Sequence, residues 1–264
     1  MNKIMKIEFK RIVNLSFIIA IGGIIFSICF DSFNDLLLCL KSGQGSVYYF
    51  FSNSAFGGMC RKYLLPVFVT LPFSASLCIE RNNKVVSYIV SREGKKRYSI
   101  VKYVVNALSG GLVAACGTAI LLAFLSVRFE FAGEDCYGAI ATDYFHKWSA
   151  LYYPQLYCLV QIILAFCRGI IWSSVAMFIS VFTKDCLVVM LSPFLGSYVC
   201  VRVCQIMQIN DNFRLDMILI GKVVVKSSGI TVLVSIIGSF LIVGMLGGLF
   251  LKKMKEGLNS GTLY

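Results

Sequence analysis

The sequence predicts an all-α integral membrane protein with six transmembrane helices. Of its 264 residues, 58% are hydrophobic and only 14% are charged, whereas a soluble domain carries about 25% charged residues. Several apolar stretches reach the roughly 20 residues that cross a bilayer as a helix. The alternation typical of barrel strands is absent, and helices satisfy their own backbone groups in lipid. No internal repeat or low-complexity linker divides the chain, so we expect one membrane domain over residues 1–264.

The predicted spans are six apolar stretches separated by more polar segments. The first is long, and no small-residue cleavage site clearly follows it, so we expect it to be retained as a membrane helix. Pro66 and Pro72 in the second stretch and Pro193 in the fifth are expected to kink their helices. In chain order the predicted spans are residues 12–30, 63–79, 103–127, 155–182, 186–206 and 229–251.

The distribution of Lys and Arg predicts the orientation of these helices. With the N-terminus in the cytosol, the inner segments hold fifteen basic residues against five acids, and the outer segments hold eight of each. An excess of Lys and Arg marks the cytosolic side of a membrane. We therefore expect a multi-pass protein of a bacterial cell membrane with both termini in the cytosol. We attribute the net charge of +12 to basic residues that set the orientation of the helices, rather than to nucleic-acid binding.

The first residues, 1–13, read MNKIMKIEFKRIV and place apolar side chains among four basic ones. This pattern is typical of an interfacial helix, which buries its apolar side in the bilayer surface and turns its charges toward anionic membrane lipid. The alternative is a positively charged flank of the first span.

A charged segment, residues 80–102, separates the second and third spans. It carries seven basic residues and only two acids, so we expect it to lie in the cytosol. Apolar residues recur in it at three- and four-residue spacing, which predicts a stripe along one side of a short helix. Gly94 can end that helix before the third span begins. The stripe consists of Val85, Val86, Ile89 and Val90.

Three pieces of the sequence together resemble the permease subunit of type-2 ABC exporters (the ABC-2 type). They are IEFKR before the first span, Glu80 closing the second, and SREGKKRYSIVKY leading into the third. In that family the N-terminal segment is an interfacial connecting helix, and the region after the second span is a coupling helix that contacts a separate ATPase. The residues to which the resemblance assigns ATPase coupling are Glu80, Val85, Val86, Ile89, Val90, Arg92, Glu93, Tyr98 and Lys102. Without the resemblance, a solvated loop with no partner explains the segment equally well.

The resemblance also implies a function and its partners. Two copies of an ABC ATPase, and a second permease copy or a related permease, would complete an exporter that moves a peptide, drug or lipid-like substrate outward by alternating access. Peptide or drug efflux, including self-protection, is the case that we favour, and antimicrobial-peptide efflux or immunity is one form of it. The alternative is an ATPase-independent membrane binding or channel protein, such as a vitamin-capturing uptake subunit.

The sequence offers no sign of chemistry of its own. It lacks the GxxxxGK[ST] loop, so ATP and Mg would bind the partner ATPase and no cofactor is expected on this chain. It also lacks HExxH and GxSxG, and His146 is the only histidine, so we expect a transport subunit rather than an enzyme, with no catalytic residue and no metal site. Most of the eleven cysteines lie in apolar stretches. Cys39, Cys60 and Cys136 fall in outer loops, where a disulfide is an open alternative.

Arg168 is unusual because it lies near the middle of the fourth span, where insertion scales give a cost of about 2.5 to 3.5 kcal/mol. We consider it a candidate for the translocation path, where it would attract an anionic substrate group or act as a gate. The alternative is that it bonds backbone carbonyls at a break near Gly169.

Gly244 and Gly248 form a GxxxG pattern in the sixth span, which suits close helix packing within the subunit or at a dimer seam.

Overall fold

The computed structural model describes residues 2–42, 46–48, 50, 59–131, 144–209 and 228–260. Over these residues the chain is helical and forms no strand, apart from an isolated bridge between Ser46 and Glu130. The all-α fold class is therefore confirmed. Cys60 is a free thiol, whereas Cys136 and the side chain of Cys39 lie outside the described residues.

Four helices are long and apolar enough to cross a membrane: α9 (Lys95–Arg128), α11 (Pro154–Ile179), α12 (Cys186–Ile206) and α14 (Ser228–Ser260). They coincide with the third to sixth predicted spans. The bounds of α12 are those predicted, and Asp185 caps its start by accepting a hydrogen bond from the Leu187 amide at 2.8 Å. The helices α9 and α14 run well beyond the lengths predicted for their spans.

The N-terminal part of the chain forms two helices instead of one continuous rod. Helix α1 (Asn2–Ile12) and helix α2 (Leu15–Asp31) meet at an angle of 54°. The Asn14 side chain caps α2 by accepting a hydrogen bond from the Phe17 amide at 3.1 Å, which fixes where the second helix begins. This pair is a fifth candidate span, and α1 corresponds to the predicted interfacial helix.

The second predicted span, residues 63–79, is not one helix. It is divided among α5 (Met59–Tyr63), α6 (Leu65–Phe68) and α7 (Ser76–Asn82), with turns at residues 69–75. Pro66 stands in the first turn of α6 and Pro72 in the turns that follow. Proline removes a backbone donor and clashes with the preceding helical turn, so two prolines six residues apart interrupt the helix. Six spans therefore remain a prediction.

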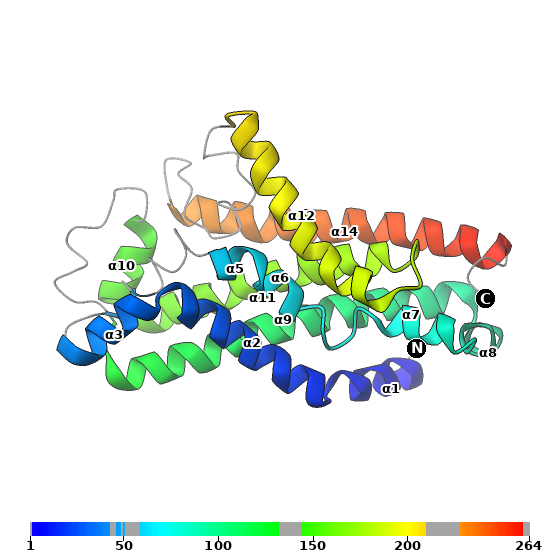
Figure 1. Cartoon of the computed structure of the whole chain (residues 1–264), viewed down its shortest axis with the longest axis horizontal. Coiled ribbons are helices and arrows are strands. Elements are labelled where there is room, and N and C mark those ends of the chain that lie inside the picture. Colours follow the sequence, from blue (N-terminus) through cyan, green and yellow to red (C-terminus); the bar gives the residue numbers. More distant parts are fainter. Residues whose placement is uncertain are drawn as a thin grey trace.

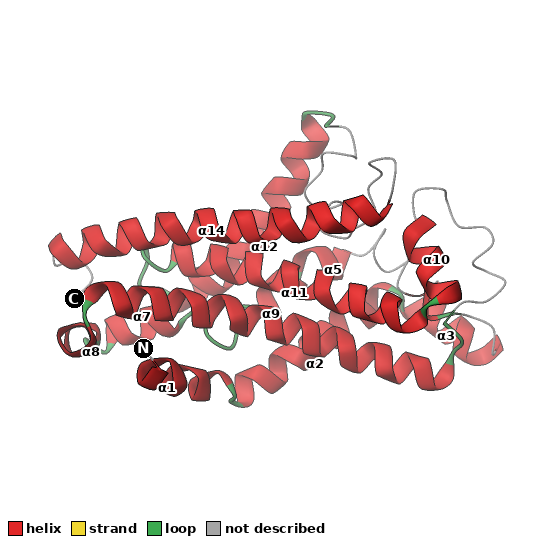
Figure 2. Ribbon diagram, turned by 180° about the vertical axis from the view of Figure 1, so that it is seen from behind, coloured by secondary structure: helices red, strands yellow, loops and turns green. Residues whose placement is uncertain are grey.

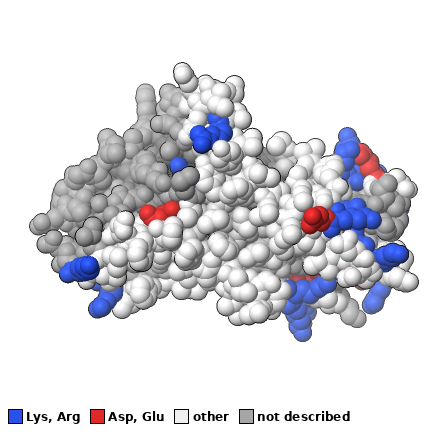
Figure 3. Space-filling model, in the orientation of Figure 1, with Lys and Arg blue, Asp and Glu red and all other residues white. Residues whose placement is uncertain are grey.

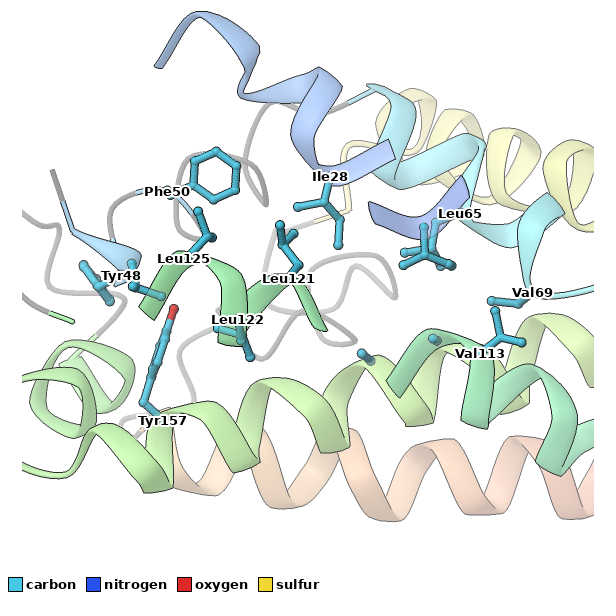
Figure 4. Close-up of a cluster of buried hydrophobic side chains, with 14 of the residues drawn as sticks. Ile28, Tyr48, Phe50, Leu65, Val69, Val113, Leu121, Leu122, Leu125 and Tyr157 are labelled. Carbon is cyan, nitrogen blue, oxygen red and sulfur yellow. The ribbon is translucent and has the colours of Figure 1, made fainter. Parts of the chain in front are cut away.

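Three shorter helices complete the described chain: α3 (Phe33–Ser42), α8 (Val86–Glu93) and α10 (Tyr144–Tyr152). Figure 1 and Figure 2 show α9, α11 and α14 lying lengthwise in an elongated bundle, with α2 along one side and α12 diverging from it. A cluster of buried apolar side chains joins α2, α6, α9 and α11 (Figure 4), and includes Ile28, Leu65, Val113 and Leu121.

Helices α9 and α11 cross at glycines. A Cβ on Gly169 would stand only 2.4 Å from the carbonyl oxygen of Gly110, so no other residue type fits there without a shift of the backbone. Beside the crossing, the Asn106 amide donates to the Ser173 carbonyl at 2.6 Å and accepts from the Ser74 hydroxyl at 2.8 Å. A polar side chain therefore links α9, α11 and the segment before α7 in the interior.

One end of the bundle gathers α1, α8 and the last turns of α14 (Figure 1). Lys and Arg side chains are concentrated on this end in the space-filling view (Figure 3). The segments for which the sequence predicts a cytosolic location thus share one end of the molecule, and we refer to it as the inner end.

Candidate functional site

The inner end contains a network of buried charges, which we call the polar hub and define as Glu8, Arg11, Glu80, Tyr98 and Lys102. The Lys102 ammonium lies 2.7 Å from Glu80 Oε1 and 3.2 Å from Glu8 Oε2. Arg11 Nη1 donates to the same Glu80 oxygen at 2.7 Å, and the Tyr98 hydroxyl donates to Glu80 Oε2 at 2.6 Å. The hub therefore joins α1, α7 and α9, three elements that are far apart in the sequence.

The charges of the polar hub balance. Two carboxylates face two cations, and Glu8, Glu80 and Lys102 are each at least 97% buried. The side chain of Arg11 is 49% exposed and forms the outer edge of the network. The Lys102 ammonium also lies 4.9 Å from the centre of the Phe73 ring, at a cation–π distance. Charges removed from water to this extent are tolerated only when they are paired and hydrogen-bonded.

The pairing sets the protonation of Glu80 and Tyr98. Burial alone would raise the pKa of Glu80, but the Lys102 charge and the hydrogen bonds from Lys102, Tyr98 and Arg11 outweigh it, so the pKa is lowered. Burial, followed by the neighbouring Glu80 carboxylate, raises the pKa of Tyr98. Glu80 is consequently an ionised acceptor and Tyr98 a protonated donor at neutral pH.

A tight turn connects the polar hub to helix α8. The amides of Lys84 and Val85 donate to the carbonyls of Arg81 and Glu80 at 3.1 and 3.0 Å, and Lys84 has a φ of 55°. This is a Schellman arrangement, in which the residue after the C-cap takes the left-handed conformation. The turn fixes the direction in which α8 leaves α7.

Arg81 anchors the same turn to the segment after α11. Its Nη1 donates to the carbonyls of Ser180, Val181 and Thr183 at 3.1 to 3.2 Å, and these carbonyls follow the last full turn of α11. Asn82 adds a hydrogen bond to the Lys184 carbonyl at 3.2 Å. The inner ends of α7, α11 and α12 are therefore held together by side chains of α7.

Helix α8 has one buried and one exposed side. Val86 and Val90 are buried in a cluster with Leu77, Tyr98 and the α14 residue Phe250. On the opposite side, Tyr88 is 76% exposed and Val85 is 39% exposed, beside the exposed Ser91 and Arg92. Gly94, with a φ of 85°, ends the helix, and α9 starts at the next residue.

The first turn of α9 is also bonded to the end of α14. Lys95 Nζ donates to the Leu258 carbonyl at 3.2 Å and to Asn259 Oδ1 at 2.9 Å. A lysine beside the last carbonyls of a helix is favoured by the helix dipole as well. The two helices that pack against the buried side of α8, α9 and α14, are thus also bonded to each other.

The structure separates the residues expected to take part in ATPase coupling into two groups. Glu80, Val86, Val90, Tyr98 and Lys102 are buried within the chain, so their side chains are not available to a partner and would act by holding α8 in place. Val85 and Arg92 are exposed, and Ile89 and Glu93 are partly buried. The role of either group in coupling stays a prediction.

Two members of the polar hub were not recognised as site residues from the sequence. Glu8 and Arg11 were interpreted only as part of an interfacial helix, although Glu8 is the single acid among the basic residues of IEFKR. An acid in a positively charged flank was the available signal, because it suggests a buried partner for a distant cation. Tyr88, which is 76% exposed on α8, was also missed because it does not belong to the apolar stripe.

The remaining candidates lie away from the inner end. Arg168 is buried at 8% exposure in α11, and α11 continues unbroken past Gly169, so the structure does not have the break that the alternative interpretation of Arg168 requires. Gly244 and Gly248 have open space beside them, and Gly247 is the glycine of α14 that packs inside the chain, against the Tyr103 ring. Among the described residues the GxxxG pattern therefore makes no close contact, and its role, in packing or at a dimer seam, stays a prediction. Among the described residues, no group of three His, Cys, Asp or Glu side chains is placed to hold a metal ion.

The fold and the site define a helical protein with four helices, and a fifth bent one, that are able to cross a membrane, joined at one end by a buried ion network. No family model matches the sequence, and the comparisons with curated proteins and with solved structures found no match either.

Proposed function

We propose that this chain is the membrane subunit of an ATP-driven exporter and that α8 is the surface on which a separate ATPase acts. The observation that carries the proposal is the placement of α8: its outer side is exposed around Tyr88, while its inner side is packed against α9 and α14. The resemblance of IEFKR, Glu80 and SREGKKRYSIVKY to ABC-2 permeases supports the same assignment.

The polar hub supplies the mechanical connection in this proposal. A displacement of α8 passes through the Schellman turn to α7 and through Gly94 to α9, and the Glu80–Lys102 contact at 2.7 Å makes these two helices move as one unit. Contacts of Glu8 and Arg11 with the same pair extend the movement to α1. An ATPase that binds α8 differently in its two nucleotide states would shift the equilibrium of the whole bundle.

In the proposed cycle, the exporter consists of two such permeases and two ATPase subunits, and it moves a peptide, drug or lipid-like substrate outward by alternating access. ATP and Mg bind the ATPase subunits. The exposed apolar sides of α12 and α14 face lipid or the second permease, and Gly244 and Gly248 offer a place for close contact between the two α14 helices.

Site-specific photocrosslinking in native membranes tests the proposal. A crosslinking amino acid at Tyr88 should capture a protein that contains a GxxxxGK[ST] loop and binds ATP, whereas the same amino acid at Phe240, on the exposed apolar side of α14, should capture lipid or a second copy of this chain. Capture of no ATP-binding protein from position 88 would contradict the proposal and favour the ATPase-independent alternative.

A functional variant of the same surface should change coupling without changing the fold. Tyr88→Asp alters a side chain that is 76% exposed, so the protein should accumulate normally and lose association with the ATPase. Val86→Asp is unsuitable for this purpose because Val86 is fully buried, and a buried unpaired carboxylate destabilises the fold.

A further inference from the structure

Arg168 is a buried charge for which the described residues provide no partner. The residue is 8% exposed, its Nε is buried with no hydrogen-bond partner, and no hydrogen bond or ion pair joins it to any part of the chain that the structure describes. A guanidinium in a membrane helix normally pairs with an acid or with backbone carbonyls. The protein therefore maintains an unfavourable charge whose compensation lies outside its own described structure.

Arg168 belongs to a buried polar row on one side of α11. Tyr157 and Gln161, at 1% and 9% exposure, precede it on the same side of the helix, because residues four and seven positions apart lie close to one line on a helix. The row extends over about 16 Å at 1.5 Å per residue. One turn after Arg168, the Trp172 ring lies against α12, 3.4 Å from the position of a Cβ on Gly196.

A second buried arginine increases the positive charge of this region. Arg61, on α5, is 5% exposed and lies close enough to Arg168 for the two charges to repel each other. The acid found near Arg61 among the described residues is Asp31, whose two oxygens accept hydrogen bonds from the backbone amides of Cys60 and Arg61 at 3.0 and 2.6 Å. Because the two charges repel each other, Arg61 provides no compensation for the buried charge of Arg168.

We propose that Arg168 binds an oxyanion, the carboxylate or phosphate group of a ligand that enters the bundle between α11 and α12. A guanidinium presents two parallel N–H donors that fit such a group, and an anion would compensate the unpaired charge. The identification of this ligand as the exported substrate rests on the proposed function, whereas the binding of an oxyanion to Arg168 does not depend on that function.

Thermal unfolding of the purified protein in a neutral detergent tests the site without any ATPase. The probes are dodecyl phosphate and inorganic phosphate, because a ligand that binds only the folded state raises the unfolding temperature. Dodecyl phosphate should raise the unfolding temperature of the wild type, and Arg168→Gln should weaken the apparent affinity at least tenfold. Arg168→Lys keeps the charge but loses the paired donors, so it should bind with intermediate affinity.

Arg202→Gln is the matched control. It removes the same charge from α12, where Arg202 is exposed and contacts Tyr198 and Gln205, so its response to dodecyl phosphate should equal that of the wild type. Without ligand, Arg168→Gln should unfold at the wild-type temperature or above it, because an unpaired buried charge contributes no stabilising bond.

Each outcome decides the proposal. An equal response of Arg168→Gln and the wild type, or an equal loss in Arg202→Gln, would overturn it. Failure of Arg168→Gln to fold while Arg168→Lys folds would also overturn it, because the charge would then be structural. A rise of the unfolding temperature with dodecyl phosphate alone would support the site and assign it to a membrane amphiphile. A rise with both probes would support the site and assign it to a soluble anion. A rise with neither probe would refute the site. None of these results depends on whether an ATPase binds α8.

Discussion

Replacing Lys102 with methionine tests whether the polar hub holds the inner end together. The substitution keeps an unbranched side chain of similar length and removes the cation that contacts both buried carboxylates. Glu8 and Glu80 would then share only Arg11, whose side chain is half exposed. We expect a large loss of stability, with the far end of the bundle unaffected.

The expected magnitude follows from the geometry of the hub. Both carboxylates contact the same nitrogen, at 3.2 and 2.7 Å, so the contacting oxygens lie within about 6 Å of each other. At an effective dielectric constant near 20, two unit charges at that separation repel by about 3 kcal/mol. Removing one partner of a buried ion pair costs about 3–5 kcal/mol in other proteins, in agreement with this value.

The free energy of unfolding in mixed micelles, measured by denaturant titration, is the suitable assay. Lys253→Met is the matched control, because Lys253 and Glu256 form an ion pair of the same 2.7 Å length with side chains 47% and 50% exposed. An exposed pair of this kind contributes little to stability, because water and salt screen the two charges. The double variant Lys102→Met with Glu80→Gln should recover part of the loss, because one of the two facing charges is gone. If Lys102→Met costs no more than Lys253→Met, the hub does not stabilise the fold.

Three further predictions concern the hub and the helix crossing. Because the folded pKa of Glu80 is below its usual 4.5, the contribution of Glu80 to stability is complete above about pH 4.5 and is lost as the pH falls through the folded pKa. Between pH 7 and pH 3, the free energy of unfolding should therefore decline more steeply for the wild type than for Glu80→Gln, and equal slopes would contradict this. Tyr98→Phe removes the donor to Glu80 Oε2 and should cost about 1.5–3 kcal/mol of unfolding free energy, and a cost under about 0.5 kcal/mol would show that the bond is not formed. Gly169→Ala should cost about 1–3 kcal/mol of unfolding free energy, because the new Cβ would stand 2.4 Å from the Gly110 oxygen. Gly244→Ala is the control, because Gly244 has open space beside it, and this change should leave the subunit intact. Similar effects of the two changes would refute the close crossing.

The sequence allowed the long helices to be predicted well where their boundaries carry local signals. The bounds of α12 were predicted correctly because a capping aspartate precedes it and polar residues follow it. The break in the second predicted span was not anticipated. Pro66 and Pro72 are visible in the sequence, but whether a proline kinks a helix or ends it depends on the packing around it, such as the Thr70 hydroxyl bonding the Met190 carbonyl 120 residues away.

The polar hub was only partly predictable. Glu80, Tyr98 and Lys102 were selected through a family resemblance, which indicated a location and gave no geometry. Their pairing with Glu8, 94 residues from Lys102, depends on the 54° bend that brings α1 back against α9, and no local pattern encodes such a contact. Which side of α8 is buried was equally unpredictable, since the apolar stripe could have faced either the bundle or a partner.

The lengths of α9 and α14 have a mechanical consequence. At 34 and 33 residues and 1.5 Å per residue they measure about 50 Å, whereas the hydrocarbon layer is about 30 Å thick. In the predicted membrane arrangement, the surplus would form a pair of stiff stalks, and Lys95 at the start of α9 bonds the end of α14. Tilting the two whole helices, each about 50 Å long, by about 4° about their outer ends would move these tips sideways by about 3–4 Å. A slight rotation of the helices in the bilayer would therefore produce an ångström-scale displacement at their inner ends.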